Sequence, residues 1–259
     1  MATLLLVRHG RTTANASGVL AGWTPGIGLD DVGRAQATAL GARLGMLPLA
    51  AVVTSPLQRC HETLAAALAA RPSKAPSPPD PVDDADLGEC GYGDWSGRPL
   101  AELAKLPLWR VVQSHPSGAT FPGEGGESMV GMQARAVAAV RQHDARVSAA
   151  AGPDAVWLAF SHGDVIKAVL ADALGMHLDA FQRIMVDPAS VSVIRYTPHR
   201  PFVVRMNDSA GDLATFAPPS RRRRSRRPAT SDAPVGGGAG PAGPIPADTP
   251  RATAPVATP

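Results

Sequence analysis

Thr3-Leu4-Leu5-Leu6-Val7-Arg8-His9-Gly10 joins a short apolar run directly to an arginine and a histidine. A continuous apolar run of this length predicts a strand that is buried on both faces, as the strands of parallel sheets are. Two later segments have the same form: Ala51–Thr54 runs into Ser55-Pro56-Leu57-Gln58-Arg59, and Ala155–Phe160 runs into Ser161-His162-Gly163-Asp164. The three segments therefore predict buried strands, each with polar side chains at its carboxyl end.

Helical patterns separate these predicted strands. Apolar residues recur at helical spacing in three groups: Ala37, Leu40, Leu44 and Leu47; Val130, Ala134, Val137 and Val140 within Ser128–Val147; and Ile166, Val169, Leu170, Ala173 and Leu174, a strongly amphipathic pattern. Pro56 is expected in the first turn of a helix, a position that accepts proline. Val191–Tyr196 and Phe202–Arg205 predict a closing hairpin. Strands that alternate with helices predict an α/β fold with a mostly parallel sheet.

Composition divides the chain into a body and a tail. Residues 1–212 are expected to form one α/β domain, with a lid insertion at about 87–126, where the periodic patterns give way to glycines and aromatics. Residues 213–259 are expected to be disordered, because their Arg-, Pro-, Gly- and Ala-rich composition cannot bury enough apolar surface.

The net charge of +3 is unevenly divided between these two parts. Residues 217–259 hold seven arginines against Asp232 and Asp248, a balance of +5, whereas residues 1–216 hold 18 basic and 20 acidic side chains, a balance of −2. A body so close to neutral does not fit nucleic-acid binding. The run Arg221–Arg227 is expected to be a solvated tail, with a non-specific contact to nucleic acid as the alternative.

Composition also bears on the compartment. Cys60 and Cys90 are the two cysteines of the chain, too few for a disulfide scaffold. No stretch approaches the roughly 20 apolar residues of a membrane-spanning helix, and the apolar run near the N-terminus is too short for a secretion signal. We expect a cytoplasmic protein without a membrane partner. Whether it forms a homo-oligomer is left open.

The strand ends indicate a site for a phosphate ester. Ligands of open α/β sheets bind beyond the carboxyl ends of the strands, so Arg8, His9, Arg59 and His162 are expected to meet. Guanidinium groups bind phosphate oxygens bidentately, and the N–H groups at a helix start, such as that of Gly163, add donors. The arginines also lower the pKa of a neighbouring imidazole. A neutral His9 could then attack phosphorus and form a phosphohistidine.

An acid is still needed to protonate the leaving oxygen. Glu89 lies in Leu87-Gly88-Glu89-Cys90-Gly91-Tyr92-Gly93-Asp94-Trp95, within the predicted lid, and is the candidate. The same carboxylate could later activate the water that cleaves the phosphohistidine.

Five motifs, in this order, resemble the histidine phosphatase superfamily, the phosphoglycerate-mutase-like proteins. They are Leu6–Thr12 with Asn15; Ser55–Arg59 with Glu62 and Thr63; Glu89–Gly97; Gly125–Ser128; and Ser161–Asp164. The similarity covers roughly residues 3–207, and five linked motifs are far more specific than one.

The resemblance implies a three-layer α/β/α fold with a mixed sheet and a reaction without metal or cofactor on small phosphorylated substrates. It implies a phosphoenzyme on His9, a phosphate pocket of Arg8, Arg59, His162 and Asn15, and Glu89 as acid and base. For Asn15, capping of the turn after the first strand is the alternative.

Two other functions stay open beside hydrolysis. The first is a phosphomutase, whose family branch carries lid arginines that grip a second acidic group. Here the lid offers Arg98, Lys105 and Arg110, and Ala21 stands where many relatives have a polar side chain, so hydrolysis is favoured. The second is a phosphate-binding module without turnover.

Two other phosphatase chemistries do not fit. A cysteine phosphatase needs an arginine six positions after its cysteine, but Ala66 and Ser96 follow Cys60 and Cys90 at that spacing. Asp84-Ala85-Asp86 has the spacing of an aspartyl phosphatase, but it follows an acidic, Pro-rich segment instead of an apolar strand.

Overall fold

The computed structural model describes residues 2–210 of the chain. The residues predicted to form a disordered tail, 213–259 with Arg221–Arg227, lie outside the described residues. Their disorder stays a prediction, and a non-specific contact with nucleic acid stays the alternative to a solvated tail. Within residues 2–210, no helix is long and apolar enough to span a membrane.

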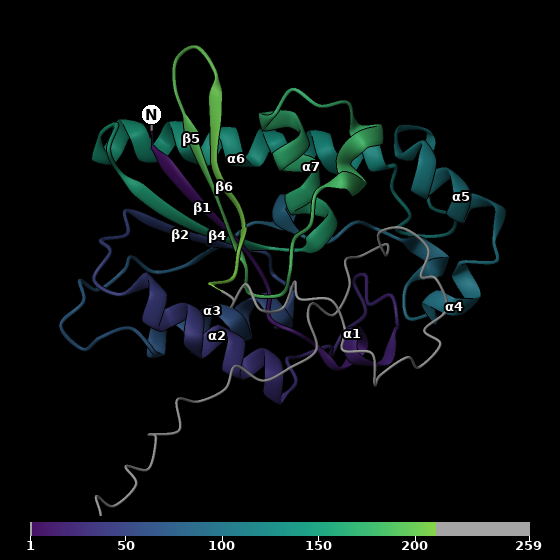
Figure 1. The fold of residues 1–259 in the computed structure, drawn as a ribbon, viewed down its shortest axis with the longest axis horizontal. Helices are drawn as coiled ribbons and strands as arrows, with labels where there is room; N and C mark the ends of the chain where they lie inside the picture. Colours follow the sequence, from purple (N-terminus) through teal and green to yellow (C-terminus); the bar gives the residue numbers. More distant parts are fainter. Residues whose placement is uncertain (1, 211–259) are drawn as a thin grey trace, which may run out of the picture.

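One mixed sheet of six strands forms the middle layer (Figure 1), in the order β3-β2-β4-β1-β5-β6. The strands are β1 (Thr3–Arg8), β2 (Ala51–Thr54), β3 (Val82–Asp83), β4 (Val156–Ser161), β5 (Val191–Tyr196) and β6 (Pro201–Asp208). β1 and β2 both pair with β4 in parallel, and β3 pairs with β2 in parallel, while β5 and β6 are antiparallel. The predicted mixed, mostly parallel α/β sheet is confirmed.

Helices cover both faces of this sheet (Figure 1), with α2 and α3 on one side and α6 and α7 on the other. The helices are α1 (Thr13–Ser17), α2 (Asp31–Leu44), α3 (Gln58–Ala69), α4 (Leu100–Leu103), α5 (Pro107–Ser114), α6 (Met129–Ala151) and α7 (Gly163–Ala173), with the 3-10 turns η1 (Ala85–Leu87), η2 (Gly93–Trp95), η3 (Pro116–Gly118) and η4 (Leu178–Arg183). The three-layer prediction is therefore confirmed.

The strands supply apolar side chains to two cores because successive residues of a strand face opposite sides. Leu4 and Leu6 of β1 belong to the core that contains α6 and α7. Val7 of β1 and Phe160 of β4 belong to the smaller core under α2 and α3. The apolar runs are continuous because both faces of each central strand are covered.

Three details of the predicted helices are wrong. Pro56 precedes α3, whose N-cap is Leu57, because the chain first turns there with the Leu57 N–H bonded to Ser55 Oγ at 3.3 Å. Leu47 lies beyond the end of α2. On α6 the N-terminal half of the buried face runs through Met129 and Met132, which leaves Val130 47% exposed.

α7 differs most from its predicted pattern. The sequence predicts an amphipathic helix, but α7 packs against α6, η4, β1 and β6, and its polar residues Asp164 and Lys167 are buried together with its apolar face. A buried charge requires a partner or hydrogen bonds. Asp164 and Lys167 therefore need polar contacts within the fold to offset the cost of their burial.

Candidate active site

The pairing of β1, β4 and β2 brings the predicted site residues to one edge of the sheet. Arg8 is the register partner of Ser161, and Thr54 is that of Phe160. His9 continues from β1 with its N–H bonded to Ser161 O at 3.0 Å. The rings of His9 and His162 lie with their centroids 5.2 Å apart. Two histidines far apart in sequence thus face each other at the carboxyl end of the sheet.

The His9 ring is held in one tautomer. Nδ1 lies 2.7 Å from Gly10 O, and because a carbonyl oxygen only accepts, Nδ1 carries the hydrogen. Nε2 therefore keeps its lone pair. Burial lowers the pKa of His9 well below its ordinary value, and Arg59 and Arg8 lower it further. The ring is neutral at physiological pH and can act as a nucleophile.

Gly10 has to be a glycine where it follows this histidine. A Cβ there would meet the carbonyl oxygen of Gly33 at 2.6 Å, too close for any side chain. The Gly10 N–H donates to Thr63 Oγ1 at 2.9 Å, which ties the loop to α3. The backbone acceptor for His9 Nδ1 is thereby fixed in place.

Arg59 and His162 form a second fixed pair. Arg59 Nε donates to His162 Nδ1 at 3.2 Å, and Arg59 Nη2 donates to Gly22 O at 2.9 Å. Because Nδ1 accepts, Nε2 of His162 carries the hydrogen and donates to Ser55 Oγ at 2.7 Å. Burial lowers the pKa of His162 well below its ordinary value, with Arg59, His9 and Arg8 adding to the effect.

Arg8 is a buried cation beside these rings. Its Nη1 donates to Val186 O at 2.8 Å, in the loop before β5. Burial lowers the pKa of Arg8, while Glu89, Asp164 and Asp187 act in the opposite direction. Nothing in the sequence pattern assigns a role to the Val186 loop, which supplies this acceptor.

Glu89 lies next to the histidine pair. Its Oε1 accepts from the Cys90 N–H at 3.0 Å, and its Oε2 lies 3.8 Å from His162 Nδ1. Burial and then Asp164 raise the pKa of Glu89 to about 7, against the opposing effects of Arg59, the Cys90 N–H and Arg8. A carboxyl group with this pKa is partly protonated at neutral pH, as a general acid must be.

Arg135 on α6 and Glu127, just before α6, hold the Glu89 loop in place. Arg135 donates to the carbonyl oxygens of Asp86, Gly88 and Glu89 at 2.7, 2.9 and 3.0 Å. It also binds both carboxylate oxygens of Glu127, whose Oε1 accepts from the Gly91 N–H at 2.7 Å. Glu127 lies in a motif of the sequence, but Arg135 has no sequence signal, because only the tertiary approach of α6 gives it this role.

Replacement of Arg135 by alanine should loosen the Glu89 loop. We expect kcat to fall about 10- to 100-fold with little change in KM, because a small misplacement of a catalytic group costs this much. Steady-state kinetics of Arg135→Ala against Arg141→Ala measures it, since Arg141 lies on the same helix and pairs with Asp172 at the surface. Equal kinetics in the two variants would rule out the clamp.

The other two predicted binding residues lie at helix starts. Asn15 Oδ1 accepts from the Thr12 N–H at 3.1 Å and from Thr12 Oγ1 at 2.9 Å, in the capping box of α1. Asn15 thus makes the capping contacts that the alternative predicts. Its side-chain amide nitrogen would be the atom that contacts a phosphate. Gly163 is the first residue of α7, directly after His162. The site roles of both residues stay predictions.

A cavity adjoins the loop that carries Glu89. It measures about 510 Å³ and is lined by Trp23, Thr24, Pro25, Gly91, Tyr92, Gly93, Ser96, Glu124 and Gly125. Trp23 Nε1 donates to Glu89 O at 2.6 Å, so one wall of the cavity is bonded to the residue of the candidate acid. Within residues 2–210, no group of three or more His, Cys, Asp or Glu side chains is arranged to hold a metal ion.

The chain matches the profile of a known protein family and resembles several named proteins. The profile of the histidine phosphatase superfamily (branch 1) matches residues 4–209. The chain is 31% identical over 173 residues to 2,3-bisphosphoglycerate-dependent phosphoglycerate mutase 2 of Gloeobacter violaceus, covering 66% of this chain and 75% of that protein. It is 32% identical over 180 residues to glucosyl-3-phosphoglycerate phosphatase of Mycolicibacterium vanbaalenii, covering 68% and 76%.

The fold is also shared with solved structures. Bacillus stearothermophilus YhfR superimposes with a TM-score of 0.69 at 27% identity, over 80% of this chain and 98% of that one.

Proposed function

Since the chain belongs to the histidine phosphatase superfamily (branch 1), we propose that it hydrolyses phosphomonoesters through a phosphohistidine on His9. Phosphoric monoester hydrolysis as the reaction class follows from the family and its phosphatase relatives. The observation that carries the role of His9 is its neutral ring, with Nδ1 bonded to Gly10 O and two arginines beside it.

In the first step, the Nε2 lone pair of His9 attacks phosphorus and the bond from phosphorus to the ester oxygen breaks. The carboxyl proton of Glu89 passes to that oxygen, so the leaving group departs as an alcohol and Glu89 becomes a carboxylate. Arg8 and Arg59 stabilise the charge on the transferring oxygens, the Gly163 N–H adds a donor, and His162, which accepts from Arg59 Nε, holds that arginine in place beside the phosphate. We propose that no metal ion is needed, because the two guanidinium groups supply the positive charge.

In the second step, the Glu89 carboxylate takes a proton from a water molecule as its oxygen attacks the phosphohistidine. The bond between phosphorus and Nε2 breaks, phosphate leaves, and both His9 and Glu89 return to their starting states. One carboxyl group thus serves as acid and then as base.

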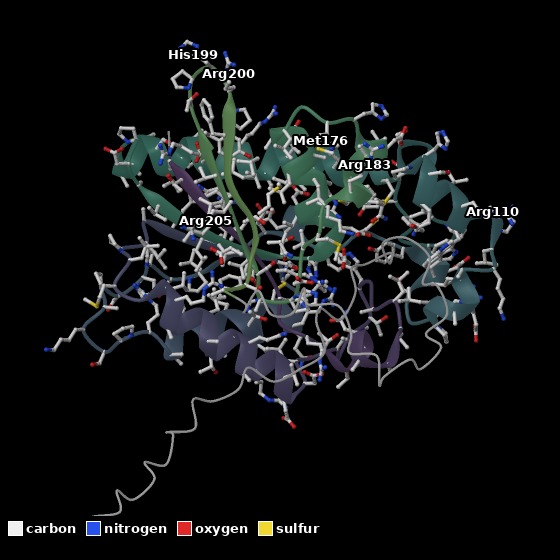
Figure 2. The ribbon with its side chains drawn as sticks, in the orientation of Figure 1. Arg110, Met176, Arg183, His199, Arg200 and Arg205 are labelled. Carbon is white, nitrogen blue, oxygen red and sulfur yellow. The ribbon has the colours of Figure 1, made fainter. Side chains whose placement is uncertain are left out.

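Hydrolysis is favoured over phosphomutase activity, which the relative from Gloeobacter violaceus suggests. A mutase must grip a second acidic group, but Arg98 pairs with Glu102, and Lys105 and Arg110 are exposed. Figure 2 shows Arg110 at the outer rim of the molecule. Incubation with a bisphosphorylated sugar acid tests this preference: we expect free phosphate, and an isomerised product would favour the mutase.

The leaving group lies on the side of the acid that protonates it. The cavity beside Glu89 is therefore the proposed site for the alcohol part of a small phosphorylated metabolite. Its lining includes the indole of Trp23, three residues with hydroxyl groups and the carboxyl group of Glu124. This lining supports an uncharged, polar alcohol. A cytoplasmic location, in keeping with the two free, buried cysteines, is also proposed.

A screen of phosphomonoesters in excess chelator tests the function as a whole. We expect release of inorganic phosphate from several esters of small alcohols, undiminished by the chelator. Phosphate or vanadate binding without turnover of any ester would instead favour the binding module.

The pH dependence of the first step should follow Glu89. Its pKa is raised to about 7, so the proton needed for donation is present below that pH and is lost above it. We expect kcat/KM for alkyl phosphates, corrected for substrate ionisation, to fall above pH 7. The value of kcat/KM for p-nitrophenyl phosphate, whose leaving group needs little protonation, should fall much less.

Glu89→Gln provides the matching variant. Loss of the donor should lower kcat/KM for alkyl phosphates about 10²- to 10⁴-fold and remove the alkaline limb of their profile. Glu102→Gln, at the surface on α4, should behave as wild type. A wild-type rate that rises steadily up to pH 9 would contradict the role of Glu89.

A further inference from the structure

A buried hydroxyl group lies between two buried carboxyl groups at the edge of the site. Tyr92 Oη is 2.9 Å from Asp164 Oδ2 and 3.4 Å from Glu89 Oε1. All three side chains are buried, with at most 3% of each residue exposed. The proposed mechanism uses Glu89 but gives no task to Tyr92 or Asp164.

Tyr92 has a single hydroxyl hydrogen and two acceptors for it. Asp164 is the nearer by 0.5 Å, and the 3.4 Å contact to Glu89 is long for a bond between hydroxyl and carboxylate. The hydrogen therefore goes to Asp164. Glu89 Oε1 is left with the Cys90 N–H, and its Oε2 faces His162.

Other groups also favour a charged Asp164. Lys167 Nζ lies 3.6 Å from Asp164 Oδ1 and bonds to Gln182 Oε1 at 3.0 Å. Asp164 also lies in the first turn of α7, where the helix dipole favours an anion. Two nearby carboxyl groups in a buried site do not both ionise readily, so a charge on one keeps the proton on the other.

The charged and titratable groups that act on Glu89 come from every element packed around it. They are Cys90 and Tyr92 on its own loop, Arg8 at the end of β1, Arg59 and Cys60 on α3, His162 after β4, Asp164 and Lys167 on α7, and the clamp of Arg135 and Glu127. Arg8 and Arg59 favour ionisation of Glu89, and among the carboxylates Asp164 is the one that opposes it most.

We propose that Tyr92 is a positioning residue that assigns the proton shared by Glu89 and Asp164 to Glu89, by donating its own hydroxyl hydrogen to Asp164. This inference rests on the proposed function, because a protonated Glu89 matters only if it donates to the leaving oxygen. Without the Tyr92 hydroxyl, the Asp164 anion loses this one donor, and the shared proton moves from Glu89 towards Asp164. A Glu89 that has lost this proton enters the first step already ionised and cannot protonate an alcohol.

Tyr92→Phe tests this assignment in the full-length protein. We expect kcat/KM for an alkyl phosphate to fall about tenfold on the plateau below the alkaline limb, because one lost hydrogen bond to a charged group moves the shared proton towards Asp164 by about that factor. The limb itself should not move to lower pH, because above it both carboxyl groups are ionised and hold no proton to share. Turnover of p-nitrophenyl phosphate should stay within about twofold of wild type, because its phenolate leaves without a proton.

The other tyrosine of the chain provides the matched control. Tyr196 is buried on β5, where its charged neighbours are Asp172, Arg141 and Asp144 and not the site. Tyr196→Phe should leave the plateau rate unchanged. An unchanged plateau rate in Tyr92→Phe, or an equal fall in Tyr196→Phe, overturns the proposal.

A double-mutant cycle with Asp164→Asn shows whether Tyr92 acts through Asp164. Removal of the Asp164 charge should itself move the limb to lower pH, and Tyr92→Phe should then cause no fall in the plateau rate, because no second carboxyl group competes for the proton. An equal fall in the Asp164→Asn background means that Tyr92 acts on Glu89 directly, which contradicts the inference. If Asp164→Asn does not unfold cooperatively, the comparison of the two tyrosines still decides. If the His9→Ala variant still hydrolysed the esters at the wild-type rate, this result would instead refute the proposed function.

Discussion

His9→Ala should lower the hydrolysis of every phosphomonoester that the wild-type protein cleaves by at least about 10⁴-fold, the scale seen when a catalytic nucleophile is removed. His9 is expected to form the covalent bond to phosphorus, and an alanine leaves no lone pair at that position. The loss should appear in kcat for aryl and alkyl phosphates alike, because both kinds of ester need the attack by His9, whether or not their leaving group needs a proton. Release of inorganic phosphate in excess chelator measures it.

A second histidine separates this effect from general damage. His177 is 72% exposed in its side chain and lies near Asp179, so His177→Ala should keep wild-type activity. Thermal unfolding should show that both variants fold. Residual activity of His9→Ala within about 100-fold of wild type would exclude a phosphohistidine on His9 as the main route.

Arg59→Ala should have the second largest effect. Arg59 lies beside His9, donates to His162 and Gly22, and is expected to stabilise the transferring oxygens. An arginine in this role contributes about 10³ to 10⁵ to phosphoryl transfer, so kcat/KM should fall by that factor. Inhibition by vanadate should weaken in parallel, because the same guanidinium group is expected to bind the anion.

Arg59→Lys distinguishes charge from geometry. A lysine keeps the positive charge but cannot bond to His162 and Gly22 through the two nitrogens of one planar group. We expect it to recover only a small part of the lost activity. Arg34→Ala, which removes an exposed arginine paired with Asp31, should change nothing. Full activity in Arg59→Lys would mean that the fixed geometry of Arg59 is not needed.

The sequence was sufficient for those parts of the site that depend on strand ends. Arg8, His9 and His162 follow apolar runs, and parallel strands end at the same edge of the sheet. Their meeting could therefore be predicted without coordinates. Arg59 follows the second of these runs by five residues, on the first turn of α3.

The remaining parts depend on tertiary contacts that leave no periodic signal. Arg135 reaches the Glu89 loop only because α6 passes beside it. Asp164 and Lys167 mark a polar helix face by their spacing, yet α7 is enclosed and both are buried. β3 is two exposed residues long, so it carries no pattern that could identify it.

Direct observation of the phosphoenzyme is the sharpest test of the account. A rapid alkaline quench of the reaction with ³²P-labelled substrate should trap a fraction of the active chains with a phosphoryl group that is stable to alkali and lost in mild acid. Glu89→Gln with an aryl substrate should raise the trapped amount, because the second step lacks its base. ³¹P NMR and peptide mapping should place the group on Nε2 of His9, since Nδ1 is bonded to Gly10 O. Turnover without a labelled chain, or a label on any other residue, would contradict the account.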